Sequence, residues 1–198
     1  MTPKRKNRGI HSYDISEGGD FAFVKSSSFD TPSTTHLIRL PGHEKVKAVE
    51  ANRKLKKNVK PLELGSTEFF YVDIGAEAPL HARCILPAGF DPSKKYPLLI
   101  YVYGEPVGQV VRDEWGGKTH MWHHMLAQQG YVVMSFDNRG TAAPRGRAWR
   151  RAAHRRIGVL APEDQAAALQ RVLEDRPYLD SKRVGIWGWS GGGSMTLN

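Results

Sequence analysis

The residues that decide the fold lie near the C-terminal end of the sequence, where positions 183–193 read RVGIWGWSGGG. Their first part, Arg183–Trp187, carries β-branched and aromatic side chains and indicates a β-strand. The strand leads directly into Gly188-Trp189-Ser190-Gly191-Gly192. A sharp turn with the serine at its apex requires small residues two positions before and after it, because the Cα atoms there crowd together. Gly188 and Gly192 meet that requirement.

The pattern G-x-S-x-G at positions 188–192 is the signature of the nucleophile elbow of α/β-hydrolases. In such an elbow the serine hydroxyl is exposed for attack, and the backbone N–H of the next residue, here Gly191, points at the developing oxyanion. A glycine-rich turn whose serine has no catalytic role can have the same sequence pattern. The pattern therefore indicates a nucleophile elbow only if the surrounding strands and helices fit that fold.

The strands expected before the turn support the hydrolase interpretation. Residues 96–103 (YPLLIYVY) and 131–136 (YVVMSF) are apolar on both faces, which is typical of strands covered by helices on both sides. Residues 69–74 and 79–86 are expected to form two further strands joined by the loop 75–78. Together with the helices between them, these strands predict a mostly parallel α/β sheet.

Two helices are expected between the strands. Apolar residues at Met121, Met125 and Leu126 have helical spacing, and Gly130 is placed to end that helix. A second helix is expected to start after Pro162, because acidic residues follow it and suit the first turn of a helix.

The first part of the chain has a different texture. Residues 10–65 are polar, and Phe21–Val24 and Thr35–Leu40 are short strand candidates bounded by turn residues, as in a propeller blade. Positions 45–60 contain seven Lys and Arg residues and are interpreted as a solvated basic helix or linker, with a nucleic-acid patch as the alternative. We therefore predict a first domain at residues 1–65 and a second at 66–198.

Composition excludes several classes of protein. The chain of 198 residues has 29 Lys and Arg against 20 Asp and Glu, a formal net charge of +9. Its single cysteine excludes an internal disulfide framework and a cysteine-based zinc cluster. No apolar run is long enough to cross a membrane. The basic start, MTPKRKNRG, lacks a following apolar segment and is interpreted as a solvated terminus rather than a secretory signal, which leaves the compartment open.

Two clusters of side chains invite other functions. His120 and His124 have the spacing of a zinc-binding helix, but Met121 stands where H-E-x-x-H requires Glu, so we expect a polar helix face with His123 and no metal. An arginine-rich segment comprises Arg139, Arg145, Arg147, Arg150, Arg151, Arg155 and Arg156. We expect ion pairs with neighbouring protein rather than phosphate binding, because no nucleic-acid-binding motif accompanies these residues. No cofactor is expected.

Tyr103 is the second candidate site residue. It stands at the end of the strand 96–103, where a loop of this fold supplies another donor to the oxyanion. A tyrosine hydroxyl can act as that donor from its side chain. On spacing alone, a half-buried tyrosine with its hydroxyl in water is an equal alternative.

Three stretches together resemble the prolyl oligopeptidase family of serine peptidases, in particular its dipeptidyl peptidase IV-like branch. They are YPLLIYVYGEP at 96–106, DNRGT at 137–141 and GIWGWSGGG at 185–193. Asp164-Gln165, before the last strand, also fits that branch. The resemblance extends over most of the chain, roughly residues 10–198.

The resemblance implies a serine peptidase that acts on short peptides, with specificity for a residue such as proline before the scissile bond. It implies Ser190 as nucleophile, with the Gly191 N–H and the Tyr103 hydroxyl as oxyanion hole. Family members join a β-propeller to an α/β-hydrolase domain, so residues 1–65 resemble the end of a propeller. The resemblance leaves room for a homodimer. One departure is Gly191, since the residue after the nucleophile is often larger, such as Tyr or Asn.

The rest of a catalytic triad is missing from the sequence. A serine nucleophile needs a base and an orienting acid, which follow in the order Ser, Asp, His in this fold. None of the eight residues after Ser190 is Asp or His. We therefore expect a fragment of a larger enzyme that is inactive alone. An esterase or acyl-aminoacyl peptidase on the same fold is the main alternative, and a basic nucleic-acid-binding module is a distant one.

Overall fold

The structure is a computed structural model of the chain and describes residues 8–77, 79–106 and 108–198. The chain falls into two compact units. The first comprises Met1–Leu62 with Arg112–Met121, and the second Glu63–Val111 with Trp122–Asn198. Lys4, Arg5 and Lys6 lie outside the described residues, so the interpretation of the basic terminus stays a prediction.

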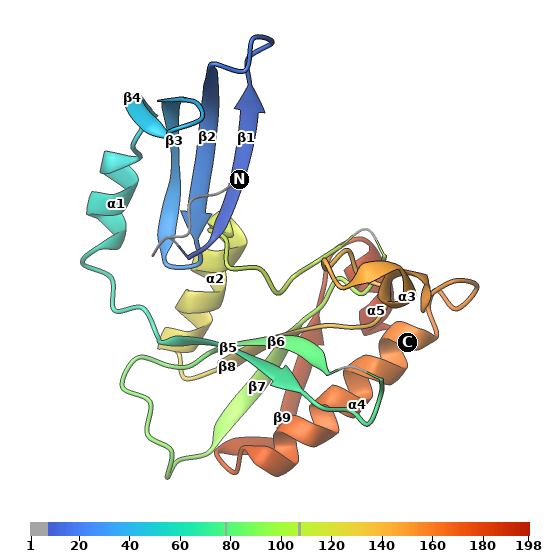
Figure 1. Ribbon diagram of the computed structural model, residues 1–198. Coiled ribbons are helices and arrows are strands. Elements are labelled where there is room, and N and C mark those ends of the chain that lie inside the picture. The colour runs from blue at the N-terminus through green and yellow to red at the C-terminus, as the bar shows by residue number, and fades with distance from the viewer. Residues whose placement is uncertain (1–7, 78, 107) are drawn as a thin grey trace. The chain divides into compact units, whose positions relative to one another are not determined.

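The first unit contains a four-stranded antiparallel sheet in which neighbours in sequence are neighbours in space (Figure 1). The strands are β1 (Ile10–Ile15), β2 (Phe21–Ser28), β3 (Thr31–Arg39) and β4 (Glu44–Glu50), followed by helix α1 (Arg53–Val59). The strand expected at 21–24 lies within β2, and the one expected at 35–40 lies within β3 except for Leu40, which follows the strand. Ala22, Phe29 and Ile38 are the buried apolar residues of this region, so the sheet has a thin core.

The basic segment 45–60 is only partly the helix that we expected. Its first part is β4, an edge strand that pairs with β3, and only Arg53–Val59 is helical. Residues 45–48 alternate charged and apolar side chains with a period of two, which suits a strand rather than a helix. Every residue of β4 is exposed and α1 buries none, so the segment is solvated as expected.

The second unit contains a five-stranded mixed sheet. Its strands are β5 (Thr67–Val72), β6 (Leu80–Ile85), β7 (Tyr96–Tyr101), β8 (Val132–Asp137) and β9 (Leu179–Trp187), in the spatial order β5-β6-β8-β7-β9. The strands β8, β7 and β9 are parallel, as predicted. The strand β6 pairs antiparallel with both β5 and β8, so the sheet is mixed rather than mostly parallel.

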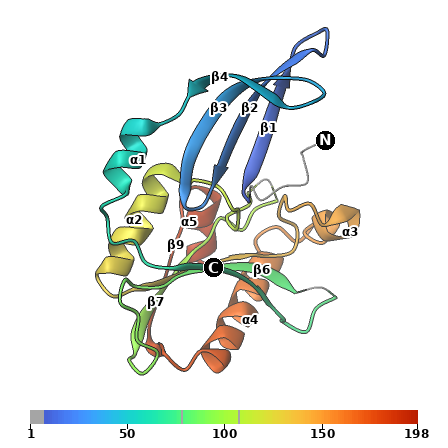
Figure 2. The same ribbon diagram turned by 60° about the vertical axis from the view of Figure 1, so that its left-hand side comes forward.

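Helices α2 (Gly117–Gln128), α3 (Gly146–Arg151), α4 (Leu160–Asp175) and α5 (Gly191–Thr196) complete the described elements. The helix α4 runs along the mixed sheet and buries Ala168 and Val172 in its core (Figure 1, Figure 2). It begins at Leu160, before Pro162, and not after it as expected. Proline is tolerated there because the N–H groups of a first helical turn have no partner within the helix.

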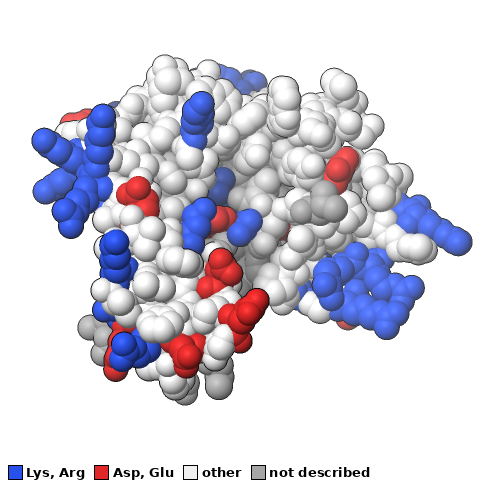
Figure 3. Space-filling view, turned by 90° about the horizontal axis from the view of Figure 1, so that it is seen from above, with Lys and Arg blue, Asp and Glu red and all other residues white. Residues whose placement is uncertain are grey.

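No helix among the described residues is long and apolar enough to span a membrane. Figure 3 shows acidic side chains close to basic ones near the middle of the face that it presents, and groups of basic side chains at two of its edges.

Candidate nucleophile site

Ser190 occupies the turn between β9 and α5 and has an unusual backbone conformation. Its φ is 56° and its ψ is −121°, whereas residues other than glycine rarely adopt a positive φ. Such a conformation costs on the order of 1–3 kcal/mol and persists only where the surrounding structure enforces it. The serine is exposed. A strained, exposed serine in a sharp turn between a strand and a helix is the geometry that the elbow pattern predicts.

The two flanking glycines explain how this turn is enforced. A Cβ atom on Gly188 would lie 2.4 Å from the carbonyl carbon of Gly192 and 2.6 Å from the carbonyl oxygen of Val102. A Cβ atom on Gly192 would lie 2.3 Å from the same Val102 oxygen. The elbow is therefore packed backbone to backbone against the end of β7, and neither position has room for a side chain.

Gly191 is buried and begins α5. The N–H groups of a first helical turn have no partner within the helix and are available to a ligand. A Cβ atom on Gly191 would lie 2.3 Å from the carboxyl carbon of Glu105. The space that a larger residue would use here is thus filled by another side chain, which the sequence analysis missed.

Tyr103 lies directly beside the elbow. Its Cα is 3.2 Å from the position that a Cβ on Gly192 would take, and the residue is half-buried. Its ring packs against Gly108, where a Cβ atom would lie 2.0 Å from the ring carbon Cδ1. The structure therefore brings Tyr103, Ser190 and Gly191 to one place, and Gly108 gives the tyrosine ring its room.

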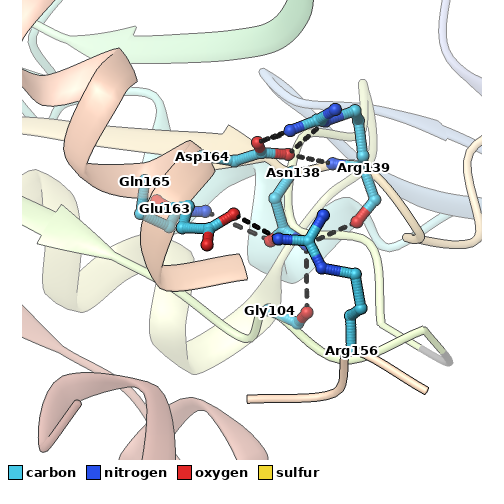
Figure 4. A network of polar contacts seen from close by, with 7 residues as sticks. All are labelled: Gly104, Asn138, Arg139, Arg156, Glu163, Asp164 and Gln165. Carbon is cyan, nitrogen blue, oxygen red and sulfur yellow. Dashed lines mark hydrogen bonds and ion pairs between the residues drawn. The ribbon is translucent and has the colours of Figure 1, made fainter. Parts of the chain in front are cut away.

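The loop that carries Tyr103 is tied to the loop after β8 by side-chain amides (Figure 4). Asn138 donates from Nδ2 to the carbonyl oxygen of Gly104 at 3.1 Å. Gln165 in turn donates from Nε2 to the Asn138 Oδ1 at 3.3 Å and to the Phe136 carbonyl oxygen at 2.9 Å. The resemblance motifs DNRGT and Asp164-Gln165 thus hold the loop next to the elbow.

A buried ion pair reinforces this connection. Arg139 Nη2 lies 2.6 Å from Oδ1 of Asp164, whose side chain is 1% exposed, and the Arg139 backbone N–H donates to Oδ2 at 2.8 Å (Figure 4). Hydrogen bonding to this carboxylate raises the pKa of the Arg139 guanidinium. Arg156 pairs with Glu163 at 2.7 Å on the exposed side of α4.

These contacts bear on the arginine-rich segment. Ion pairing is confirmed for Arg139 and Arg156, and Arg145 lies over the ring of Trp149 with its Cζ 3.9 Å from the centroid. The other four arginines, Arg147, Arg150, Arg151 and Arg155, form no ion pair within the part of the chain that the structure describes.

A second buried carboxylate supports the segment after the Tyr103 loop. Asp137 is fully buried, and its Oδ1 accepts from the backbone N–H groups of Val110 at 2.8 Å and Val111 at 3.2 Å. Burial raises the pKa of Asp137, while these hydrogen bonds lower it. Arg83 donates to the Val110 carbonyl oxygen at 3.0 Å and to Ser135 Oγ at 3.1 Å, and burial lowers its pKa to about 10.

We expected the three histidines of α2 to lie on a polar face of the helix, and this expectation is wrong. His120, His123 and His124 are each at most 2% exposed. The His120 ring packs on Phe29 and the His123 ring on Tyr101, with centroids 4.3 Å and 5.0 Å apart. An imidazole ring can pack as an aromatic ring does, which explains its place in a core. Among the described residues, no group of three His, Cys, Asp or Glu side chains is arranged to hold a metal ion.

Burial also sets the charge of one histidine. It lowers the pKa of His124 to about 4, with the nearby Arg83 as a second cause. His124 is therefore neutral at pH 7.

Known proteins resemble this chain in sequence and in structure. The model of the prolyl oligopeptidase family matches residues 119–198. A probable dipeptidyl peptidase 4 of Trichophyton verrucosum is 30% identical over 99% of this chain and 26% of its own length. The human prolyl endopeptidase FAP is 37% identical over 77% of this chain and 20% of its own length.

The structural likeness is stronger still. The crystal structure of Porphyromonas gingivalis dipeptidyl peptidase 4 matches with a TM-score of 0.89 and 35% identity, over 98% of this chain and 27% of that one. A putative dipeptidyl aminopeptidase IV from Bacteroides ovatus matches with a TM-score of 0.81 and 32% identity, over 95% of this chain and 26% of that one. The chain thus spans about a quarter of the length of these relatives, in agreement with the expected fragment.

Proposed function

The chain belongs to the prolyl oligopeptidase family, and on that premise we propose that the full-length protein is a serine peptidase that cleaves short peptides through an acyl-enzyme on Ser190. The observation that carries the proposal is the backbone of Ser190, strained at φ 56° between two glycines that cannot carry a side chain. A passive serine in a glycine-rich turn has no need of this strain.

In the proposed reaction the Ser190 hydroxyl attacks the carbonyl carbon of the scissile bond. The Gly191 N–H and the Tyr103 hydroxyl stabilise the oxyanion that forms, and loss of one such donor typically slows an enzyme by about 10²–10³. The position of Tyr103 beside Gly192 supports its role. The base and the orienting acid are proposed to come from residues other than these 198, so that this chain alone turns over no substrate.

We also propose the division of domains that the family suggests. Residues 1–65 are the end of a β-propeller with its linker, which the four-stranded antiparallel sheet β1–β4 supports. Residues 66–198 are the first part of an α/β-hydrolase domain, which the strand order β5-β6-β8-β7-β9 and the turn after β9 support. A homodimer of the full-length protein remains compatible with this assignment.

The names of the relatives, dipeptidyl peptidase and prolyl endopeptidase, support a peptide substrate with a dipeptidyl-peptidase-like cleavage. The esterase or acyl-aminoacyl peptidase alternative uses the same elbow. Comparing aminoacyl-prolyl anilides with p-nitrophenyl esters and N-acylated amino-acid anilides on the full-length protein separates them, since the proposal expects the first class to be hydrolysed fastest.

The nucleophile is tested by labelling the full-length protein with a fluorophosphonate. We expect the label on Ser190, and Ser190→Ala should abolish both the label and hydrolysis. Ser194→Ala is the matched control, because Ser194 is an exposed serine of the same helix and should leave labelling unchanged. Labelling that persists in the Ser190→Ala protein would refute the assignment.

A further inference from the structure

The space beside Gly191 is occupied by a carboxylate. A Cβ atom on Gly191 would lie 2.3 Å from Cδ, 2.5 Å from Oε1 and 2.7 Å from Oε2 of Glu105. The carboxylate therefore lies where the side chain of the residue after the nucleophile would lie in a protein with a larger residue there. It lies beside Gly191, whose N–H is the proposed oxyanion donor.

The backbone of Glu105 is held so that its side chain takes this position. The preceding Gly104 has a φ of +81° and no room for a Cβ, which would lie 2.4 Å from the Met195 Cγ. Its carbonyl oxygen accepts from Asn138 at 3.1 Å, and the Glu105 carbonyl oxygen accepts from the Gly108 N–H at 3.0 Å. The carboxylate is thus part of an ordered loop and not the tip of a loose one.

The charge of Glu105 is not matched within the described residues. The residue is half-buried, and none of the ion pairs or side-chain hydrogen bonds in the described ranges involves its carboxylate. It lies against the residue whose N–H is the proposed oxyanion donor. Because like charges repel, an unmatched carboxylate here opposes the negative charge of the transition state.

We propose that Glu105 is a specificity-determining residue that accepts hydrogen bonds from an ammonium group on the acyl part of the substrate. The inference rests on the proposed function of Ser190. A substrate ammonium in contact with Glu105 would neutralise the carboxylate and remove the repulsion, and charge-assisted hydrogen bonds are the stronger ones in proteins. The ammonium comes either from a free amino terminus or from a basic side chain.

The test uses three peptide diphenyl phosphonates that are designed to modify Ser190 and that differ in whether and where they carry an ammonium group. The first has a free amino terminus, the second is N-acetylated, and the third is N-acetylated with a lysine-type side chain at the acyl residue. Rates of modification of the full-length protein are measured by intact mass. We expect wild type to prefer one ammonium-bearing compound over the neutral one, and Glu105→Gln to reduce that preference about tenfold.

Two further variants sharpen the result. Glu77→Gln removes an exposed acid of the same unit and should leave the preference unchanged, which excludes an effect of net charge. Gly191→Ala keeps the backbone N–H but displaces the Glu105 carboxylate, so it should reduce the preference in wild type and add nothing in the Glu105→Gln background.

The outcomes separate the two proposals. If no phosphonate modifies Ser190, the proposed nucleophile is wrong. If Ser190 is modified and the preference is the same in wild type and Glu105→Gln, the nucleophile stands and the role of Glu105 is overturned. The compound that loses its advantage in Glu105→Gln identifies the source of the ammonium.

Discussion

The two sheets of the chain differ in how much of each strand is buried. All residues of β8 in the mixed sheet are buried, whereas all residues of β4 in the antiparallel sheet are exposed. The mixed sheet carries the strained turn at Ser190, with a φ of 56°, and the antiparallel sheet has a positive φ of 57° at His43, in the turn between β3 and β4. A strained conformation persists only where packing enforces it. At Ser190 that packing comes from Gly188 and Gly192 against the Val102 carbonyl oxygen at the end of β7, because β9 lies at the edge of the sheet and buries only Leu179.

The largest expected effect on stability comes from truncating a buried side chain of the mixed sheet. Phe136 of β8 is fully buried, so Phe136→Ala should cost about 4 kcal/mol through lost packing and a residual cavity. Val46 of β4 is 52% exposed, so Val46→Ala should change stability by less than about 0.5 kcal/mol. Hydrogen exchange of the full-length protein measures both. Equal protection losses in the two sheets would contradict the comparison.

The ion pairs of α4 should differ in the same way. Asp164→Ala leaves Arg139 and its backbone N–H without their buried partner and should cost about 3 kcal/mol. Glu163→Ala removes an exposed partner of Arg156 and should cost less than about 1 kcal/mol. The loss of stability in the two variants is measured by hydrogen exchange of the α4 amides at increasing denaturant concentration. A larger loss of stability in Glu163→Ala than in Asp164→Ala would show that burial is not the deciding factor.

The elbow allows a test with neighbouring glycines. Gly192→Ala forces a Cβ to within 2.3 Å of the Val102 carbonyl oxygen and should destabilise the turn by about 1–3 kcal/mol, with slower fluorophosphonate labelling of Ser190. Gly193→Ala is the control, because its Cβ would lie 3.7 Å from the Gly188 oxygen, an ordinary contact. Both proteins are compared by labelling rate; slowing by Gly193→Ala alone would refute the packing argument.

The smallest effect concerns pH. The pKa of His124 is about 4 in the folded protein and near 6.5 when unfolded, so the unfolded state binds the extra proton between these values. Stability is therefore complete above pH 6.5 and is lost as pH falls toward 4. Acidification from pH 7 to 5.5 should cost about 1 kcal/mol.

The variant His124→Gln should lose that part of the pH dependence. Thermal unfolding of both full-length proteins at the two pH values measures the difference. An identical pH response in wild type and His124→Gln would show that His124 is not its source.

Much of the mixed sheet and its elbow could be predicted because the signals are local. Two-faced apolar runs marked β7 and β8, and the crowded positions 188 and 192 accept only glycine. The burial of His120, His123 and His124 could not be predicted, because histidine is a polar residue type and the aromatic rings that pack on it are known only from the structure. The contact of Glu105 with Gly191 joins positions far apart in sequence, and only folding brings them together.

Positions 105 and 191 share one volume, and this limits the order in which the site can be redesigned. A bulky residue at 191, of the kind that family members often have, first requires a short residue at 105. If position 191 is enlarged first, two side chains must share the space of one. Position 105 therefore has to be shortened before position 191 can be enlarged. The order of substitutions is set by the available volume, and the change of charge at position 105 comes with the first of them.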